Sequence, residues 1–422
     1  MTATKEAVLD RQALQRSRVI GILFIVIGAA IYLLFATTSD PGQTAAFGLN
    51  PGRQTAALPI PELVLPVLPS LYAMSLVAVC LGVWQLAKGF GRAEGAMLGL
   101  VALFLTVSFL AWAARGKGLN LVGILETTLQ RATPIALAAL SGMLCERSGI
   151  VNIAIEGMML TAALVSALVG SISGSLWVGL IAALIASGLL GALLAVLSIR
   201  FKVNQVIAGT AINILATGIT SYFSSRYLQK YAALNSPPTF SPIPLPGLSR
   251  IPVIGPALFD HTFLVYLTFI LVIVIQLMLF YTRWGLRTRA VGEHPRAADT
   301  LGVNVFRTRY VNVLLGGCIA GLGGAYLVLS SVARFDELMT AGKGYIGLAA
   351  MIFGKWNPVG ALGSSLIFGF ADSLQTRLAI LSVPIPSQFL LMAPYLVTMV
   401  VLAGVVGQSR APAADGEPYE KE

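Results

Sequence analysis

Apolar runs of roughly 20 residues, long enough to cross about 30 Å of hydrocarbon as a helix, recur along nearly the whole chain. The composition agrees: 56% of the residues are hydrophobic and 11% are charged, whereas soluble globular chains carry about 25% charged residues. Lipid offers no partner for backbone N–H and C=O groups, so segments that cross it form helices or closed barrels. Because these runs have the length of helices rather than of strands, the sequence predicts an all-α, polytopic integral membrane protein.

We expect about 10–12 transmembrane helices, with boundaries uncertain by a few residues. One of these segments, Tyr345–Phe353, is too short for a full crossing and predicts a half-helix or re-entrant element, which is tolerated only when buried or lining a cavity. The predicted spans are Val19–Ala36, Leu63–Ala87, Gly95–Ala114, Leu121–Leu144, a fifth that contains Asn152 and Glu156, Leu176–Ile199, Val203–Tyr222, Thr262–Tyr281, Val311–Ser330, Tyr345–Phe353, Val359–Leu378 and Phe389–Val406.

Basic residues predict the orientation of these spans. Arg11, Arg16 and Arg18 precede the first span, and cytoplasmic segments are enriched in Lys and Arg, so the N-terminus is predicted to be cytoplasmic. Counting spans alternately then places the Arg-rich loop 283–310 and the C-terminus inside as well. The net charge of +10 therefore indicates membrane orientation in a plasma-membrane, multi-pass protein and gives no indication of nucleic-acid binding.

The same patterning divides the chain into segments with different expected roles. Residues 408–422 are short, polar and acidic, and we expect a disordered cytoplasmic tail there. The full division is a cytoplasmic N-terminus at 1–17, extra N-terminal spans at 18–114 with an external loop at 37–62, a core at 115–407 that includes the cytoplasmic loop 283–310, and the tail at 408–422.

Polar side chains inside the predicted spans are the candidate functional residues. An ionisable group at membrane depth costs a few kcal/mol or more, so such groups usually face a bundle interior or a water-filled path. Glu156 is expected either to gate a path or to pair with a neighbouring Arg, and its spacing from Asn152 predicts that both lie on one helix face. Asn204, Asn213 and Thr217 lie in the seventh span, where amides and hydroxyls either contact a passing solute or hydrogen-bond between helices.

The loop 283–310 contains a predicted short helix. Pro295 is suited to a first helical position, and Gly302 follows where such a helix would stop. An Arg-flanked helix of this kind suits docking into a groove of a soluble partner, although a plain positively charged cytoplasmic loop has the same composition.

Three stretches together resemble a known family of membrane proteins. They are Cys145–Met159, the loop just described, and the run from Gly342 to Pro358. The chain resembles, over roughly Leu121–Gly407, the membrane permease subunits of bacterial ABC importers for ribose-type sugars, branched-chain amino acids and nucleosides. The run Glu146-Arg147-Ser148-Gly149-x-Val151-Asn152-Ile153-x-x-Glu156-Gly157-Met158 is similar in particular to the nucleoside branch, whose members are often described as simple-sugar permeases.

The resemblance implies partners and a role for the short helix. It implies ABC ATPase subunits, a second permease copy or paralogue, and an external solute-binding protein. The chain itself has no Gly-x-x-x-x-Gly-Lys-Ser/Thr phosphate loop, which agrees with ATP being hydrolysed by the partners. The residues that would couple to the ATPase are Glu293, Pro295, Arg296, Ala297, Ala298, Leu301 and Gly302.

No cofactor, metal site or catalytic residue is predicted. His261 and His294 lack metal partners at useful spacing, and Cys80, Cys145 and Cys318 are expected to serve packing. We therefore expect a non-catalytic transport subunit that moves a small polar solute, most favourably a nucleoside. The alternatives are a monosaccharide or branched-chain amino-acid permease, an ion-coupled secondary transporter that uses Glu156 and Asn152, and, more weakly supported, a membrane enzyme.

Overall fold

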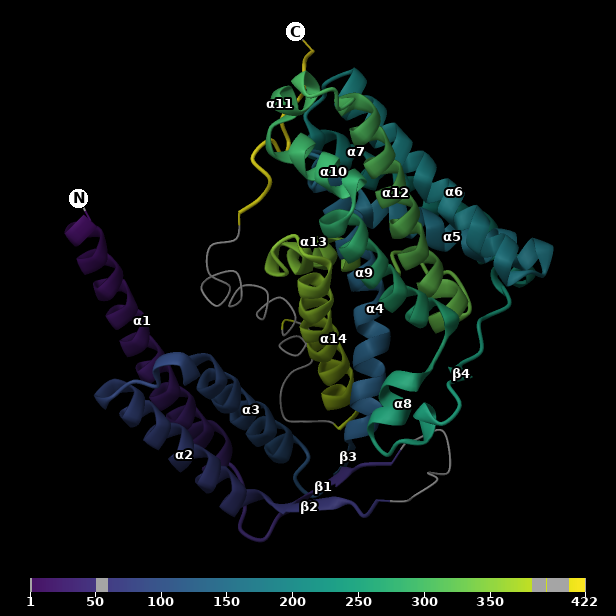
Figure 1. Cartoon of the computed structure of the whole chain (residues 1–422). Coiled ribbons are helices and arrows are strands. Elements are labelled where there is room, and N and C mark those ends of the chain that lie inside the picture. Colours follow the sequence, from purple (N-terminus) through teal and green to yellow (C-terminus); the bar gives the residue numbers. More distant parts are fainter. Residues whose placement is uncertain (1, 51–59, 382–391, 393–409, 422) are drawn as a thin grey trace. The chain divides into compact units, whose positions relative to one another are not determined.

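A computed structural model describes residues 2–50, 60–381, 392 and 410–421, and most of the described chain is helical (Figure 1). The predicted last span, Phe389–Val406, lies outside the described residues. The chain forms two compact units, one of residues 1–123 with 377–385 and the other of residues 124–376 with 386–422. The all-α prediction is confirmed.

The first unit contains three long helices and a small sheet that the sequence analysis did not anticipate. Strand β1 pairs antiparallel with β2 and parallel with β3, so that part of the predicted external loop is extended and hydrogen-bonded. The elements are α1 (Thr2–Ala30), which continues as the π-helical turn η1 (Ile31–Ala36), β1 (Thr44–Gly48), β2 (Leu63–Pro66), α2 (Val67–Ala87), the 3₁₀ turn η2 (Gly91–Ala93), α3 (Glu94–Ala113) and β3 (Gly118–Asn120).

The second unit contains the remaining helices, with α4 and α14 each crossing the boundary between the units. Its helices are α4 (Leu121–Glu146), α5 (Ile155–Ser173), α6 (Leu176–Ala195) with η3 (Val196–Arg200), α7 (Gln205–Phe223) with η4 (Ser224–Leu228), η5 (Ala232–Asn235), η6 (Leu248–Arg250), α8 (Ile254–Phe259), α9 (Phe263–Tyr281), α10 (Arg283–Glu293), α11 (Pro295–Thr300), α12 (Val305–Tyr326) with η7 (Leu327–Val332), α13 (Lys343–Phe353) and α14 (Pro358–Ile380). A two-stranded ribbon joins β4 (Ile243–Pro244) to β5 (Asp260–His261).

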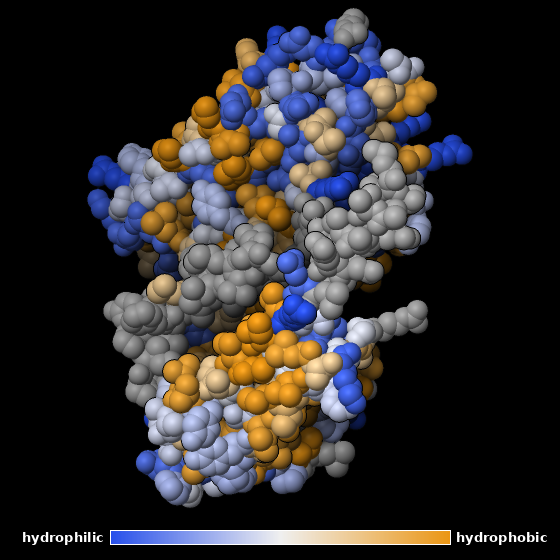
Figure 2. Space-filling view, turned by 90° about the vertical axis from the view of Figure 1, so that its left-hand side faces the viewer, coloured by the Kyte–Doolittle hydropathy of each residue, from blue (hydrophilic) through white to orange (hydrophobic). Residues whose placement is uncertain are grey.

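The helices have the length and surface of membrane spans. Eight helical stretches in the described part of the chain are long and apolar enough to cross a membrane. Large apolar side chains project from them into the surroundings, among them Leu76, Ile185 and Ile214. Figure 2 shows broad hydrophobic areas on the helices, whereas hydrophilic residues gather at the top of the view, around α10, α11 and the C-terminus. The polytopic prediction is therefore confirmed.

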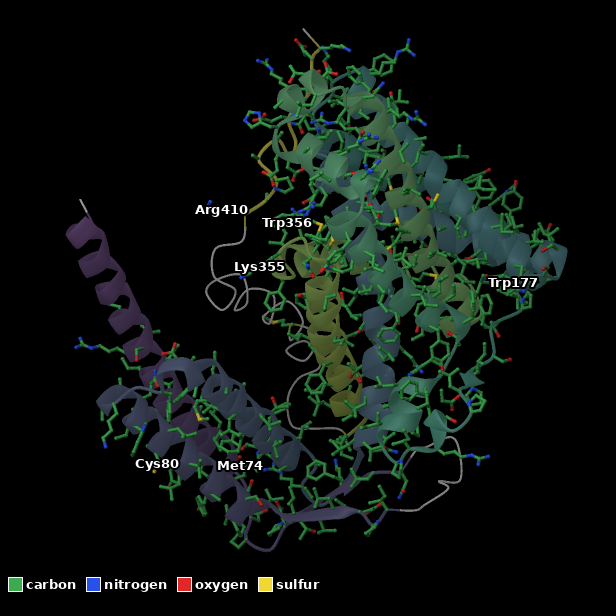
Figure 3. The ribbon with its side chains drawn as sticks, viewed as in Figure 1. Met74, Cys80, Trp177, Lys355, Trp356 and Arg410 are labelled. Atoms are coloured by element: carbon green, nitrogen blue, oxygen red, sulfur yellow. The ribbon has the colours of Figure 1, made fainter. Side chains whose placement is uncertain are left out.

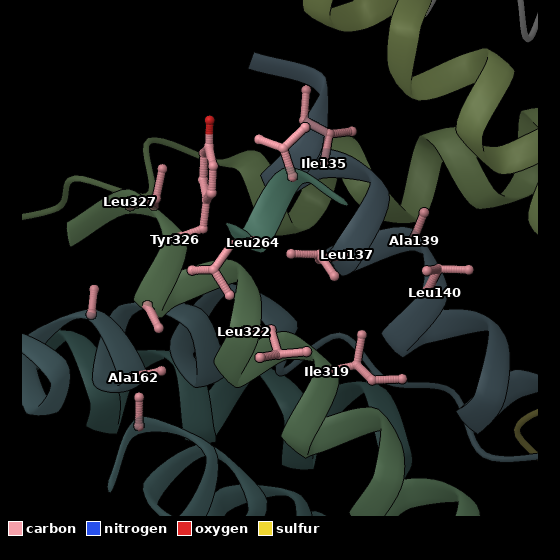
Figure 4. Close-up of a cluster of buried hydrophobic side chains, with 14 of the residues drawn as sticks. Ile135, Leu137, Ala139, Leu140, Ala162, Leu264, Ile319, Leu322, Tyr326 and Leu327 are labelled. Carbon is pink, nitrogen blue, oxygen red and sulfur yellow. The ribbon is translucent and has the colours of Figure 1, made fainter. Parts of the chain in front are cut away.

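Small residues allow the helices of the second unit to approach closely. A Cβ on Gly317 of α12 would lie 3.2 Å from the Cα of Gly191 on α6, and the Ser187 hydroxyl donates to the Gly317 carbonyl at 2.6 Å. In a membrane the hydrophobic effect does not drive helices together, because lipid tails are as apolar as the side chains. Small residues that allow close backbone packing are therefore a common basis of helix association there. In the same unit, Leu137, Leu140 and Leu322 belong to one buried apolar cluster from α4, α5, α9 and α12 (Figure 4).

Residues 410–421 correct one prediction. We expected a disordered tail, but Ala414 is 4% exposed and Tyr419 is 6% exposed, so both side chains pack into the second unit. Short polar tails are usually disordered because they bury little apolar surface. Here the packing depends on one aromatic side chain and on backbone hydrogen bonds, neither of which stands out in the composition.

Candidate functional site

Residues 147–154, which we call the α4–α5 junction, form a compact loop that includes Asn152, which the sequence had placed inside the fifth span. Helix α4 ends at Glu146, Gly149 adopts a left-handed φ of 85°, and α5 begins only at Ile155. A left-handed glycine is the usual way to end a helix, because it closes the last carbonyls without a steric penalty. Asn152 therefore precedes α5, and the prediction that it shares a helix face with Glu156 is wrong.

Asn152 is fully buried in this junction. Its Nδ2 lies 3.4 Å from the Cys145 Sγ, and its Oδ1 has no hydrogen-bond partner among the described residues. The amide thus packs the junction against the end of α4. A contact between Asn152 and a passing solute stays a prediction.

The Glu156 carboxylate binds the start of the half-helix α13. Its Oε1 accepts the Gly342 N–H at 2.8 Å, and its Oε2 accepts the Gly344 N–H at 2.7 Å. The first N–H groups of a helix have no partner within the helix, and the positive end of the helix dipole favours a carboxylate there. A Cβ on Gly344 would lie only 2.6 Å from the Glu156 backbone nitrogen, so the glycine permits this approach. Glu156 therefore fixes α13 to the first turn of α5.

Asn213 ties α7 to the same place. Its Oδ1 accepts the Gly157 N–H at 2.8 Å, while its Nδ2 donates to the Ile153 carbonyl and to the Tyr345 hydroxyl, both at 2.9 Å. One amide side chain thereby joins α7, the end of the junction and α13. The sequence analysis had left hydrogen bonding between helices and solute contact open for Asn213, and this geometry provides the first.

The other two predicted path residues lie elsewhere on α7. Asn204 caps the helix, because its Oδ1 accepts the N–H groups of Val206 and Ile207 at 3.0 and 3.2 Å. Thr217 lies one turn beyond Asn213 and is half-buried, and its carbonyl accepts the Thr220 hydroxyl at 3.1 Å. Of the five predicted path residues, the structure brings Asn152, Glu156 and Asn213 together around the start of α5.

Two residues at the end of α4 hold the turn between α13 and α14. Trp356 Nε1 donates to Glu146 Oε2 at 2.7 Å, and Arg147 donates to the Trp356 carbonyl through Nε and Nη2 at 3.1 and 2.9 Å. Lys355 and Trp356, labelled beside α13 in Figure 3, both have left-handed backbones, with φ of 57° and 50°. Such a conformation costs free energy in residues other than glycine and persists when neighbouring contacts fix it. Arg147 of the junction and Glu156 in the first turn of α5 thus hold α13 near its two ends.

The predicted short helix in the loop 283–310 is present. It is α11, with Pro295 at its first position and Gly302 just beyond its end at a φ of 81°. Arg296 and Ala297 face solvent, Ala298 is buried, and Leu301 is 83% exposed. Glu293 forms the end of α10 immediately before it. A short helix that carries an exposed arginine and ends at an exposed leucine is a surface suited to a protein partner.

Helices α10 and α12 pack directly on the α4–α5 junction. A Cβ on Gly292 would lie 2.3 Å from the Arg147 carbonyl oxygen, so only glycine fits there. Arg309 of α12 is 1% exposed, and its Nε donates to the Ser148 carbonyl at 3.2 Å. The junction therefore touches the α10–α11 segment on one side and α13 on the other.

Comparison with known proteins identifies the family. Residues 124–406 match the family described as the branched-chain amino acid transport system permease component. The chain belongs to this permease family. The permease is 41% identical to the guanosine ABC transporter permease of Bacillus subtilis and 39% identical to the nucleoside ABC transporter permease of Lactococcus lactis. Each of these two alignments covers 71% of the permease and 96% of the relative.

A putative glucose ABC transporter permease of Haloferax volcanii is 36% identical to the permease over 60% of this chain and 77% of that relative. No solved structure matches the chain significantly. These results confirm the resemblance inferred from the sequence, including its extent over the second unit. The first three helices lie outside the matched range.

Several residues that complete the site had no individual role predicted from the sequence. They are Trp356, Gly292 and Arg309, and all three contact the junction. The signal available for Arg309 was its position in an apolar helix, where a buried cation must find partners. Its partners are carbonyl groups, which no sequence pattern displays.

Proposed function

We propose that this permease is the membrane subunit of an ATP-driven importer of nucleosides. The observation that carries the proposal is the 41% and 39% identity to a guanosine and a nucleoside permease, each matched over 96% of its length. The glucose permease aligns over less of this chain, 60%. Purine and pyrimidine nucleosides are therefore the first substrates to test, and monosaccharides the second.

The permease would work by changing conformation and not by catalysis. Partner ATPases would bind and hydrolyse ATP, since the sequence has no phosphate-binding loop of its own. The exposed surface of α11, with Arg296 and Leu301, would dock in the ATPase, which suits its place after the Arg-rich helix α10. In this arrangement the N- and C-termini are cytoplasmic, as the basic residues predict.

The α4–α5 junction offers a route from α11 to the membrane interior. Movement of α11 and α10 would press on the Arg147 carbonyl through Gly292, which allows no space between them. The junction and the first turn of α5 would pass that movement to α13 through the Arg147–Trp356 and Glu156–Gly344 hydrogen bonds. Tightly packed groups transmit displacement because they are not continuously deformable. A half-helix held at both ends is therefore the element that we expect to open or close the path.

The proposal also requires partners that complete the transporter. A second permease copy or a paralogue would supply the other half of the path, and an external solute-binding protein would deliver the nucleoside. Asn152, Glu156, Asn204, Asn213 and Thr217 remain the proposed path residues, and the hydrogen bonds of Glu156 and Asn213 favour positioning over direct contact for these two.

Uptake in cells tests the proposal. Cells that carry or lack this gene would be given labelled guanosine, with unlabelled nucleosides, ribose or glucose as competitors. We expect gene-dependent uptake that nucleosides inhibit and sugars do not, and that stops when the partner ATPase is inactivated. Inhibition by glucose alone would assign a sugar substrate, and uptake that survives loss of the ATPase would indicate ion-coupled transport.

A further inference from the structure

Residues 411–421, which we call the C-terminal strap, lie against the end of the second unit that carries α10, α11 and α12 (Figure 1). The strap begins with a backbone contact to the end of α10. Ala414 N–H donates to the Gly292 carbonyl at 2.9 Å, and Ala413 N–H donates to Glu293 Oε2 at 3.2 Å. Gly292, where the Arg147 carbonyl leaves no space for a Cβ atom, is thus also bound by the strap.

The strap is anchored by one aromatic side chain. Tyr419 is 6% exposed, and its ring centroid lies 5.4 Å from that of Phe306 on α12. It belongs to a small apolar cluster with Val291 of α10 and Ala298 of α11. A buried aromatic side chain contributes most of the apolar contact in such a small cluster. This single side chain therefore packs against all three helices of the segment that includes α11.

Polar groups extend the contact to the α4–α5 junction and to α6. Arg309 Nη1 donates to the Glu417 carbonyl at 3.0 Å, while its Nε holds the Ser148 carbonyl of the junction. The Asp415 carboxyl lies beside that of Glu146 at the end of α4. Glu420 forms an ion pair with Lys202, which follows η3, and Lys421 lies 3.7 Å from Asp299 of α11.

We infer that the C-terminal strap locks α11 to the α4–α5 junction, so that the two move as one body when the ATPase moves α11. A strap that bound only α10 and α11 would not do this. The contacts described above reach the end of α4 through Asp415 and the junction through Arg309, and so span both sides of the proposed coupling route. This inference rests on the proposed function, since it assumes that α11 receives the movement of an ATPase.

The strap also shapes the surface around α11. The strap and the α10–α11 turn border a surface pocket of about 550 Å³. His294 and Arg296 line one side of it, and Glu417 and Tyr419 line the other. An ATPase that docks at α11 would therefore meet the strap as well as the helix. Loss of the strap should loosen α11 and lower the number of solute molecules transported per ATP.

Hydrogen exchange and coupled transport test the strap with two variants, Tyr419→Ala and a chain that ends at Arg410. Arg410→Ala is the matched control, because this exposed side chain precedes the strap. In both variants we expect amide exchange of residues 290–302 to rise by about tenfold, because local opening becomes easier. In the reconstituted complex with its ATPase, we expect transport per ATP to fall by about fivefold, within the usual range of coupling between sites.

The two measurements separate the possible failures. Unchanged exchange in both variants would show that the strap does not hold α11. Increased exchange with unchanged transport per ATP would show that the strap stabilises the fold without coupling, and would also overturn the inference. If wild-type permease neither binds the ATPase nor transports nucleosides, the proposed function fails, whereas the exchange measurement still decides whether the strap holds α11.

Discussion

Glu156 is the residue whose role can be decided most sharply, because bracing and solute contact predict different kinetics. Both carboxylate oxygens accept backbone N–H groups at the start of α13. In Glu156→Gln one oxygen becomes an NH₂ donor facing an N–H group, and losing a hydrogen bond to a charged group costs about 2 kcal/mol. We expect a lower melting temperature and a lower maximal uptake rate, with the KM for nucleoside within about twofold of wild type.

Glu337→Gln, a change at an exposed carboxylate, serves as the control for Glu156→Gln and should leave both uptake and stability unchanged. A raised KM at an unaltered maximal rate would instead place Glu156 in contact with the solute. Wild-type stability together with wild-type uptake would remove Glu156 from both roles.

Asp415 makes docking of the C-terminal strap dependent on pH. Burial raises the pKa of Asp415 to about 7, although the hydrogen bond to Glu146 and the Arg309 charge act in the opposite direction. The docked strap therefore holds the proton more tightly than the free tail, in which Asp titrates near a pKa of about 3.9. The contribution of Asp415 to docking is therefore complete below about pH 3.9 and has been lost once the pH has risen through about 7.

We accordingly expect a spin label at position 418 to become more mobile as the pH rises from about 4 to about 7, between the free and the raised pKa of Asp415. Cys80, the exposed native cysteine, would be changed to serine in this experiment. Asp415→Asn should remove most of the pH dependence, and a pH profile that survives this change would assign the effect to another group. Glu146 and Cys145 of α4, Arg309 of α12 and Glu417 of the strap face or neighbour Asp415 and would be the next groups to test.

At the residue level, the sequence indicated which polar side chains matter but not what they bind. Glu156 and Asn213 stood out because each interrupts an apolar segment. Their partners are the N–H groups of Gly342, Gly344 and Gly157, and backbone groups look alike in every sequence. Asn152 was misplaced for a related reason, since a loop that satisfies its own backbone can be as apolar as a helix.

Helix α11 is the element on which the proposed link to the ATPase depends. Leu301 is 83% exposed, and Arg296 also faces solvent. We expect Arg296→Ala combined with Leu301→Ala to reduce co-purification of the ATPase by about tenfold or more, because interface affinity usually resides in a few apolar and Arg side chains. The measurement is the ATPase recovered with affinity-purified permease at matched expression.

Leu248→Ala is the control for that experiment, since this exposed leucine lies in the Pro-rich segment after η4. Undiminished recovery of the ATPase with the double variant would show that α11 is an ordinary polar loop element. The sequence analysis had kept that alternative for the loop 283–310.

Among the elements, long helices were predictable and irregular ones were not. The limits of α11 followed from Pro295 and Gly302, because these residues fix backbone conformation locally. The β1–β2–β3 sheet was missed because pairing joins segments far apart in the chain, as between Phe47 and Leu119. The docked strap was missed in the same way, since Tyr419 finds Phe306 only once the chain has folded.

At the scale of the whole molecule, the family match covers the second unit, whereas the helices of the first unit lie outside it. The family match begins at residue 124, and two relatives are covered over 96% of their length by 71% of this chain. The helices α1, α2 and α3 have their own packing contacts, such as the Ser75 hydroxyl that donates to the Gly28 carbonyl at 2.7 Å. The transport machinery inferred above lies in the second unit.

A chain that begins at residue 117 should therefore still insert, bind the ATPase and import nucleosides. We expect its uptake to remain within about threefold of wild type, because the family match begins only at residue 124 and residues without shared partners contribute nearly independently. The comparison requires equal amounts of membrane-inserted protein, measured by quantitative blotting, and Glu156→Gln in the shortened chain should reproduce its effect in the full chain. A shortened permease that inserts and binds the ATPase but does not transport would show that the first unit takes part in the transport cycle.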